Sequence, residues 1–216
     1  MLLVVSVIGA AVIAGFATGG SLAPFQRLPV HWWGVALTGL ALQGVPPTIV
    51  GGRHLAPLLL LSSYTLLLVF AWLNRRLPAM LIVMAGLAMN VLVIAADGGM
   101  PVSAAAMEAA GTSPGGLADD GPSKHHLMGP GDVLTPFADV IGIPEPVGAV
   151  LSVGDLLVYV GLAALVVSVM RGRSVEDRRP PPRWFQGYRG KHLPMERRFA
   201  HRGGPAAPVA GDPWGT

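Results

Sequence analysis

Five long, almost uncharged apolar runs constrain this chain more than any other feature of its sequence. They cover residues 2–17, 30–50, 56–73, 77–96 and 148–170. Four of them have the roughly 17–25 residues that cross a hydrocarbon layer of about 30 Å, while the first is slightly short. Open strands leave backbone groups without partners in lipid, and the runs lack the period-two alternation of a barrel. We therefore predict an all-α fold, a polytopic transmembrane bundle of five spanning helices.

The composition agrees with a membrane protein. Charged residues make up 12% of the 216 residues, whereas a soluble domain carries roughly 25%. Cysteine is absent, which excludes disulfides, thiolate metal sites and cysteine nucleophiles. We expect a membrane domain over residues 1–172 and a disordered, basic cytoplasmic tail over residues 173–216. Residues 97–147, between the fourth and fifth helices, are expected to form a lid.

The basic residues predict how the helices are oriented. With five spans and a cytoplasmic tail, only Arg53 and Lys124 of the 15 Lys and Arg residues lie outside. Short cytoplasmic loops of membrane proteins carry an excess of Lys and Arg. We therefore expect a multi-pass protein of the inner (plasma) membrane, with its N-terminus and lid outside and its C-terminus in the cytoplasm.

Charge divides the two segments outside the helices. Residues 97–147 contain seven acids and one Lys, whereas residues 171–216 contain ten bases and four acids. The basic tail matches no nucleic-acid-binding fold, so we expect no nucleic-acid partner. Anionic lipid headgroups are the expected partners of the tail. A membrane protein partner, bound through lid and tail, is the scaffold alternative.

The lid is expected to contain short helices joined by turns. Residues 97–101, with the sequence Asp-Gly-Gly-Met-Pro, are typical of a turn that leaves a helix. Ser103 to Ala110 predicts a short helix, and Asp132 is placed to cap a second one over Val133 to Ile141. Such segments lie on the bilayer surface or fold back over the mouth of the bundle.

Asp155 is the one charged residue inside the five runs, and it has two interpretations. An ionisable group within a span suggests a ligand or proton site. However, Ser152 and Asp155 also have the spacing of a capping box, in which each side chain bonds the backbone N–H of the other residue. In that case the fifth helix begins near Val153.

Several other polar residues collect toward the predicted outer ends of the helices. Asn90 precedes Asp97 by seven residues, about 10 Å along a helix. Uncharged amides within a bundle also serve as hydrogen-bonding links between helices, which is the alternative role. The expected residues of an outward-facing polar pocket are Gln43, Asn90, Asp97, Gly98, Gly99, Pro101 and Asp155.

Metal and enzyme chemistry have weak support in the sequence. His125 and His126 lie near Asp139 in the acidic lid, but adjacent histidines in a loop seldom face one ion. We expect no metal and no cofactor. The sequence has no nucleophile elbow, phosphate-binding loop or dinucleotide fingerprint. Asp155 with Asp97 or His126 is the one candidate acid–base pair.

The motifs around the lid resemble a known family. They are Asn90, the turn Gly98-Gly99-Met100-Pro101-Val102, the pair Lys124-His125, Asp139, and Ser152-Val-Gly-Asp155. Over about residues 1–172 the chain resembles a bacterial membrane family known only as domain of unknown function 5317. Asp97 stands where the family pattern suggests Asn. The resemblance implies the fold and the topology, and no activity.

These observations favour a non-catalytic function. We expect binding or transport of a small solute or lipid at the outward-facing pocket bounded by Asn90, the Gly98 to Val102 turn and Asp155. The alternatives are a membrane-embedded enzyme that uses Asp155 or His126 as acid or base, and a membrane scaffold that binds other proteins through its lid and tail.

Overall fold

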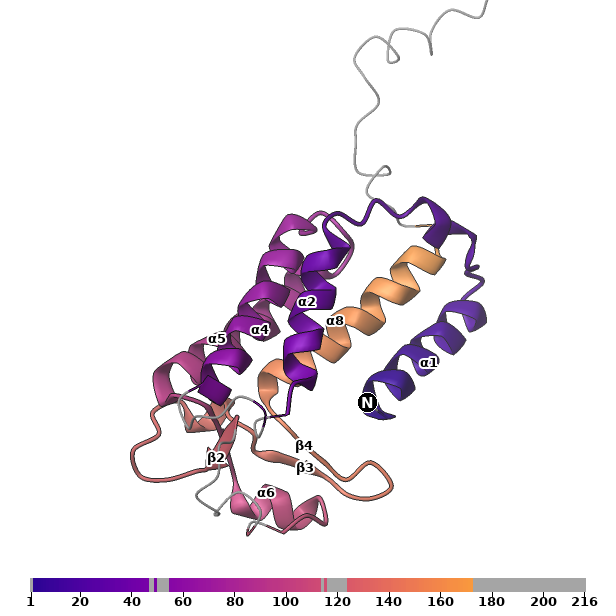
Figure 1. The fold of residues 1–216 in the computed structure, drawn as a ribbon. Coiled ribbons are helices and arrows are strands. Elements are labelled where there is room, and N and C mark those ends of the chain that lie inside the picture. The colour runs from indigo at the N-terminus through magenta and orange to yellow at the C-terminus, as the bar shows by residue number, and fades with distance from the viewer. Residues whose placement is uncertain (1, 47–48, 50–54, 114, 116–123, 173–216) are drawn as a thin grey trace, which may run out of the picture. The chain divides into compact units, whose positions relative to one another are not determined.

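The computed structural model describes residues 2–46, 49, 55–113, 115 and 124–172 (Figure 1). The predicted tail over residues 173–216 lies outside these ranges. Five of the helices in the described part follow the five apolar runs. They are α1 (Leu2–Ala17), α2 (Trp33–Gly44), α4 (Leu55–Leu73), α5 (Met80–Asp97) and α8 (Val153–Met170).

Three of these helices, α4, α5 and α8, are long and apolar enough to cross a membrane. Helix α1 has 16 residues, and α2 has 12, which corresponds to about 18 Å of rise. The second run of 21 residues thus gives a shorter helix than we expected. The helix begins after Trp32, which has a left-handed backbone with φ of 57°, and it ends at Gly44 because Val45, the residue before Pro46, is extended.

The helices form one layered bundle (Figure 1). Helix α5 packs against α8 on one side and α4 on the other, while α2 packs on α4 and α1 on α8. Successive helices run in alternating directions, and the N-terminal end of α1 lies at the same end of the bundle as the lid. We call this the lid end. The opposite end carries the α4–α5 turn at residues 74–79.

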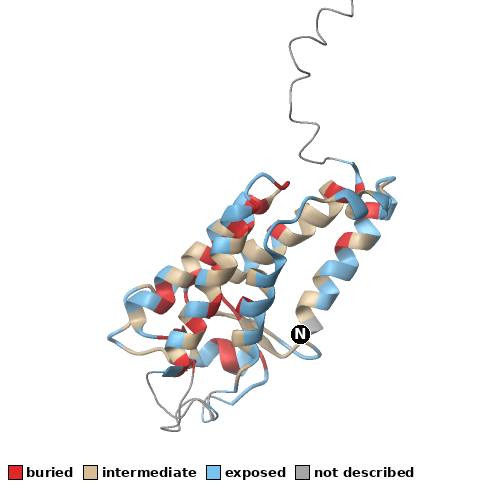
Figure 2. Ribbon diagram, turned by 45° about the horizontal axis from the view of Figure 1, so that its top comes forward, coloured by how far each residue is buried: buried red, intermediate tan, exposed pale blue. Residues whose placement is uncertain are grey.

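Much of the helix surface is apolar and exposed. Figure 2 shows buried positions along the helix contacts and exposed ones on the outward faces. Large side chains on those outward faces include Ile13, Leu58, Leu81, Leu92 and Val160. A water-soluble bundle of amphipathic helices would present charged residues there. The pattern is that of helices whose outer faces meet lipid.

The lid is a mixed structure and not wholly helical, which corrects the all-α prediction. It contains β1 (Met100–Val102), α6 (Ala104–Ala109), β2 (His125–Leu127), the 3-10 turn η2 (Thr135–Phe137) and β3 (Ile141–Ile143). The lid also extends past residue 147, because the start of the fifth apolar run forms strand β4 (Ala149–Leu151) and not helix. Strands β1 and β2 pair in parallel, and β3 and β4 pair antiparallel. These strands lie in the lid, where they do not have to cross the bilayer as isolated strands.

One predicted lid helix is confirmed and the other is wrong. Ser103 caps α6, and its hydroxyl accepts the backbone N–H of Ala106. The helix predicted over Val133 to Ile141 is reduced to η2, and β3 begins at Ile141. Pro136 removes a backbone donor within that stretch, and the β3–β4 pairing takes the last residue.

The lid is anchored on the helices by apolar contacts. Met100 and Ala138, from two separate parts of the lid, share a buried cluster with Leu60 of α4 and Val93 and Ile94 of α5. The lid end is therefore a packed interface, and polar groups within it require hydrogen-bond partners.

Candidate functional site

A buried hydrogen-bond network joins three helices at the lid end. Asp155 Oδ1 accepts a hydrogen bond from Asn90 Nδ2 at 2.7 Å and a longer one from the Tyr64 hydroxyl at 3.4 Å. The Ser152 hydroxyl donates to Asn90 Oδ1 at 2.9 Å. One side chain from α4 and one from α5 thus meet the first turn of α8.

The first turn of α8 explains why Asp155 lies there. The Ser152 hydroxyl accepts the backbone N–H of Asp155 at 2.9 Å, and Asp155 Oδ2 accepts the backbone N–H of Ser152 at 3.2 Å. This is the capping box that the sequence predicted, and α8 begins at Val153. The carboxylate also lies at the positive end of the helix dipole. Both of its oxygens are therefore used by the fold.

Glycines let Asn90 reach α8. A Cβ at Gly154 would overlap Asn90 Oδ1, and a Cβ at Gly86 would overlap the backbone oxygen of Gly154. Further along, a Cβ at Gly161 would lie 2.6 Å from Val83 Cγ2. Small residues allow helices in membranes to approach closely. The α5–α8 contact therefore depends on these three positions.

The predicted turn after α5 organises the lid. Gly98 ends the helix in the left-handed conformation, with φ of 70°, which glycine adopts without steric cost. Strand β1 follows directly and lies beside β2, with Met100 opposite His125 and Pro101 opposite His126. On the other side, the backbone N–H of Asp139 donates to the Pro101 oxygen at 3.0 Å. The turn thus places His125 and Asp139 next to each other, on either side of β1.

Asp139 has an unusual environment within this arrangement. Its side chain is only 9% exposed, and His125 Nε2 lies 3.9 Å from its Oδ2. Its Oδ1 is buried and has no hydrogen-bond partner. Burial, followed by the negative charge of Asp155, raises the pKa of Asp139 to about 8. The carboxyl group therefore holds its proton in neutral solution.

His125 lies beside Asp139, but its side chain is more open, with 41% of its surface exposed. Burial lowers its pKa, and the positive charge of Lys124 lowers it further, while the charge of Asp155 acts in the opposite direction. Neutral imidazole is therefore favoured beside a protonated Asp139. At neutral pH the two side chains together carry no net charge. Either side chain becomes charged when it gains or loses a proton, and a charged ligand nearby would favour that change.

His126 belongs to a different cluster, although it is the next residue in β2. Its Nε2 lies 2.9 Å from Asp132 Oδ1, and Asp132 Oδ2 accepts the backbone N–H of Gly129 at 2.7 Å. Burial alone would raise the pKa of Asp132, but these hydrogen bonds lower it below its usual value. Among the described residues, no group of three or more His, Asp or Glu side chains has the geometry of a metal site.

Two of the predicted pocket residues, Gln43 and Asp97, hold the lid in place. The Lys124 ammonium is buried at the end of α2 and donates to the backbone oxygens of Leu42 and Gln43, at 3.1 and 2.6 Å. A cation is favourable at this negative end of a helix. The contribution of Gln43 is therefore made by its backbone. Asp97 Oδ1 accepts the backbone N–H of Val133 at 2.8 Å, while its Oδ2 is buried without a partner.

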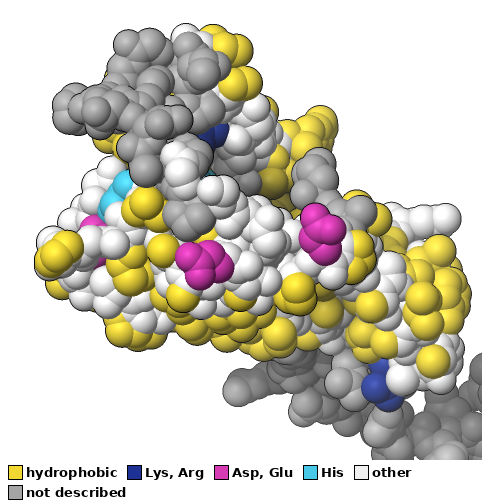
Figure 3. Space-filling model, turned by 90° about the horizontal axis from the view of Figure 1, so that it is seen from below, with side chains coloured by type: hydrophobic (Ala, Val, Ile, Leu, Met, Phe, Trp, Pro, Cys, Tyr) yellow, Lys and Arg dark blue, Asp and Glu magenta, His cyan; other side chains and the backbone are white. Residues whose placement is uncertain are grey.

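The structure thus separates the predicted residues into groups. Asn90 and Asp155 bond each other, Gly98 and Gly99 form the turn, Pro101 lies in β1, and Asp97 and Gln43 hold lid segments. Seen from below, acidic and histidine side chains lie among hydrophobic ones at the surface (Figure 3). Among the described residues, the buried side-chain polar atoms without a partner belong to Asp97 and Asp139.

Sequence reasoning missed two members of the site. Tyr64 lies within an apolar run, and its hydroxyl was a signal because buried Tyr hydroxyl groups usually have a partner. Lys124 was interpreted as an external charge and as part of the Lys124-His125 motif, without a contact assigned to it. As the single Lys within an acidic lid it was conspicuous, but its contact with α2, 81 residues away in sequence at Gln43, has no local signal.

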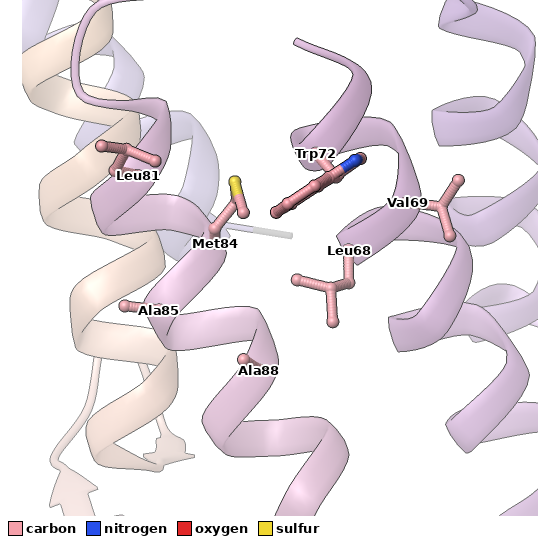
Figure 4. A pocket seen from close by; sticks show the side chains of 7 residues that line it. All are labelled: Leu68, Val69, Trp72, Leu81, Met84, Ala85 and Ala88. Carbon is pink, nitrogen blue, oxygen red and sulfur yellow. The ribbon is translucent and has the colours of Figure 1, made fainter. Parts of the chain in front are cut away.

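A separate groove of about 610 Å³ lies between α4 and α5 (Figure 4). Its lining is almost entirely apolar. The residues that line it are Leu68, Val69, Trp72, Leu81, Met84, Ala85 and Ala88. Trp72 and Met84 face each other across the space between the two helices. This groove is distinct from the polar residues predicted to form a pocket.

Long apolar helices, an apolar outer surface and a buried polar network define a helical protein of the membrane class. The chain belongs to the family of unknown function DUF5317, whose model matches residues 28–167. This match covers α2 to α8 and includes the whole polar network, and it confirms the family expected from the motifs. No curated protein and no solved structure matches the chain.

Proposed function

We propose that this protein is a five-span membrane protein that binds or moves a small, positively charged solute at its lid end, without catalysing a reaction. The N-terminus and lid lie outside and the C-terminus lies in the cytoplasm. The observation that carries the proposal is the Asp139 carboxyl group, which is buried, lacks a partner at Oδ1 and lies 3.9 Å from His125. A buried acceptor without a donor is rare unless it has a functional role.

The hydrogen-bond pattern favours binding over acid–base catalysis. Asp155 is held by Asn90, Tyr64 and the Ser152 backbone, and a group bound in this way is poorly placed to accept a proton from a substrate. His126 is bonded to Asp132 in a separate cluster. Asp155 and His126, the candidate acid–base pair, are therefore each bonded to other residues and not to one another.

The charges around Asp139 indicate the chemical class of the solute. The titratable groups within electrostatic reach of Asp139 are His125 of β2, Tyr64 of α4, and Asp155 and Tyr159 of α8. A second negative charge on Asp139 is unfavourable beside Asp155, so the site is neutralised by a proton. A small cation that donates hydrogen bonds would neutralise the same charge. Binding of such a cation would release the proton from Asp139.

Methylammonium is a suitable probe for this proposal. We expect methylammonium chloride to raise the midpoint of thermal unfolding of the detergent-solubilised chain, relative to equal ionic strength of tetraethylammonium chloride, which has no N–H donor. Because one proton competes with the cation, the apparent affinity should fall about tenfold per pH unit well below pH 8.

The Asp139→Asn variant tests which residue is responsible. It keeps the size of the side chain and removes the charge, so the response to methylammonium should disappear. Glu108→Gln removes one exposed acid from the same lid and should respond like the wild-type chain. An equal response of Asp139→Asn and wild type would refute the proposed site.

The orientation has its own test, since the natural chain has no cysteine. A membrane-impermeant thiol reagent should label Ser113→Cys in intact cells and should fail to label Ser174→Cys until the membrane is opened. Labelling of Ser174→Cys in intact cells would contradict the proposed topology. It would mean that the C-terminus lies outside and that the Asp139 site faces the cytoplasm.

A further inference from the structure

The apolar groove between α4 and α5 leads to a basic end. Trp72 lines the groove and lies one turn before Arg75 on the chain. The Arg75 guanidinium lies 4.6 Å from the centre of the Trp72 ring and donates to the Trp72 backbone oxygen at 3.1 Å. Arg76 follows in the same turn, and both arginines are exposed.

The structure around this turn is rigid enough to hold the two arginines. Asn74 is buried, and its side chain accepts the backbone N–H of His31 at 2.8 Å and donates to the His31 oxygen at 2.9 Å. Leu77 and Met80, on the other side of the arginines, belong to the buried core cluster. The backbone before and after Arg75 and Arg76 is therefore tied to the bundle.

The groove has the dimensions and chemistry of a ligand site. Its volume of about 610 Å³ lies within the range of small-molecule sites, which is roughly 300–1,000 Å³. The walls offer almost no polar atoms, so a polar solute would lose its hydration without compensation. A hydrocarbon chain has no polar groups to dehydrate, so it can occupy the groove without this loss of free energy.

We propose that the α4–α5 groove binds one acyl chain of an anionic phospholipid, whose phosphate is held by Arg75 and Arg76. The proposal joins two features that are adjacent in the structure, an apolar groove between two candidate membrane-spanning helices and a pair of exposed guanidinium groups at its end. Arginine binds phosphate oxygens through several N–H donors in a fixed plane. This site is separate from the Asp139 site and from the tail.

Small residues make room for the chain. Ala85 and Ala88 lie on the α5 side of the groove, and Ala85 is exposed. A larger residue at position 85 would occupy the space without touching the α5–α8 contact, because its neighbour Gly86 faces α8. Ala85→Phe is therefore the variant that fills the groove.

The test uses lipids whose acyl chains carry bromine, which quenches tryptophan fluorescence on contact. The full chain is placed in vesicles of unlabelled phosphatidylcholine containing a small fraction of brominated phosphatidylglycerol or brominated phosphatidylcholine. The signal of Trp72 is the difference between the wild-type chain and Trp72→Phe. This local signal does not report lipid bound by the basic tail.

We expect the Trp72 signal to show about a tenfold preference for the anionic lipid, since each basic group near a membrane surface contributes a several-fold preference. The double variant Arg75→Gln/Arg76→Gln should lose the preference, and Arg75→Lys/Arg76→Lys should retain only part of it, since the charge is kept and the planar set of N–H donors is lost. Arg27→Gln, at a basic residue of η1 (Ala23–Arg27), is the matched control and should behave as wild type.

Ala85→Phe should reduce quenching by both brominated lipids, whereas Ala14→Phe, at an exposed position of α1, should leave it unchanged. Equal quenching by the two lipids in the wild-type chain would overturn the proposal. So would an Arg75→Gln/Arg76→Gln variant that keeps the preference. A shift from dimer to monomer on Ala85→Phe, with no change in quenching, would instead identify the groove as a contact between two copies.

Discussion

Helix α5 packs against α8 and α4 through two faces that both carry small residues, and the two contacts differ in closeness. Toward α8, Gly86 touches the backbone of Gly154, and Asn90 adds hydrogen bonds. Toward α4, Ala85 and Ala88 face Leu68 and Trp72 across an open groove. Small residues on α5 are therefore accompanied by a close contact toward α8, where glycines oppose them and Asn90 adds a polar link, and by an open groove toward α4, where large side chains oppose them.

The strongest test of this comparison is a pair of substitutions at adjacent residues. Gly86→Ala adds one methyl group that overlaps the Gly154 oxygen, and we expect it to lower the free energy of unfolding by about 3 kcal/mol. Ala85→Phe adds a whole ring and should cost less than about 1 kcal/mol, because the groove has room. Thermal unfolding in detergent measures both. Equal destabilisation would mean that the two faces do not differ.

The next largest effect concerns the polar link on the α8 side. Asn90→Leu removes one donor to Asp155, which keeps its bonds from Tyr64 and the Ser152 backbone, and it leaves the buried Ser152 hydroxyl without an acceptor. We expect a loss of about 2–3 kcal/mol, since buried polar groups without partners are costly. Thr65→Val removes an exposed hydroxyl that bonds only its own helix and should change stability little. If Asn90→Leu lowered the free energy of unfolding as little as Thr65→Val, the network would not hold the helices together.

Asp139 should make the stability of the lid end depend on pH. Its pKa is about 8 in the folded protein, against the ordinary value of 3.8 in the unfolded chain, so the folded state holds a proton that the unfolded state releases between these values. Stability is then fully present below about pH 4 and falls as pH rises, by about 1.4 kcal/mol per unit between pH 5 and 7.

Comparison with Asp139→Asn isolates this contribution. The lowered pKa of His125 acts in the opposite direction, because its neutral form is the one that the folded state favours. Both chains retain His125, so the difference in unfolding midpoint between wild type and Asp139→Asn should grow steadily from pH 5 to pH 8. A difference that is constant with pH would show that Asp139 is ionised in the folded protein.

The smallest expected effect is that of Asp155→Asn. The amide keeps an oxygen that accepts from Asn90, but it weakens the capping of α8 because the Ser152 backbone N–H loses a carboxylate partner. We expect a loss of about 1 kcal/mol. Asp155→Leu should cost at least as much as Asn90→Leu. A large loss with Asp155→Asn would mean that the charge itself, and not the hydrogen bonds, holds the three helices.

Much of the site was predictable because its signals are local. The spacing of Ser152 and Asp155 predicted the cap and the start of α8, and Ser103 predicted the start of α6. The helix predicted over Val133 to Ile141 was wrong for two reasons: Pro136 was visible in the sequence, whereas the pairing of Ile141 with Leu151 was not visible in the local pattern. The early end of the second helix had a visible cause in Pro46, which the long apolar run outweighed.

The amino-acid sequence by itself determined the membrane class, the number and order of the apolar helices, the family, and the residues that are polar within an apolar setting. Hydrophobicity and capping act over a few residues, so they are readable along the chain. Only the tertiary structure decided the partners of those polar residues. The contacts of Asn90 with Ser152, of Lys124 with α2, and of β1 with β2 join positions far apart in sequence. Such contacts depend on how closely the helices approach, which shape and packing determine.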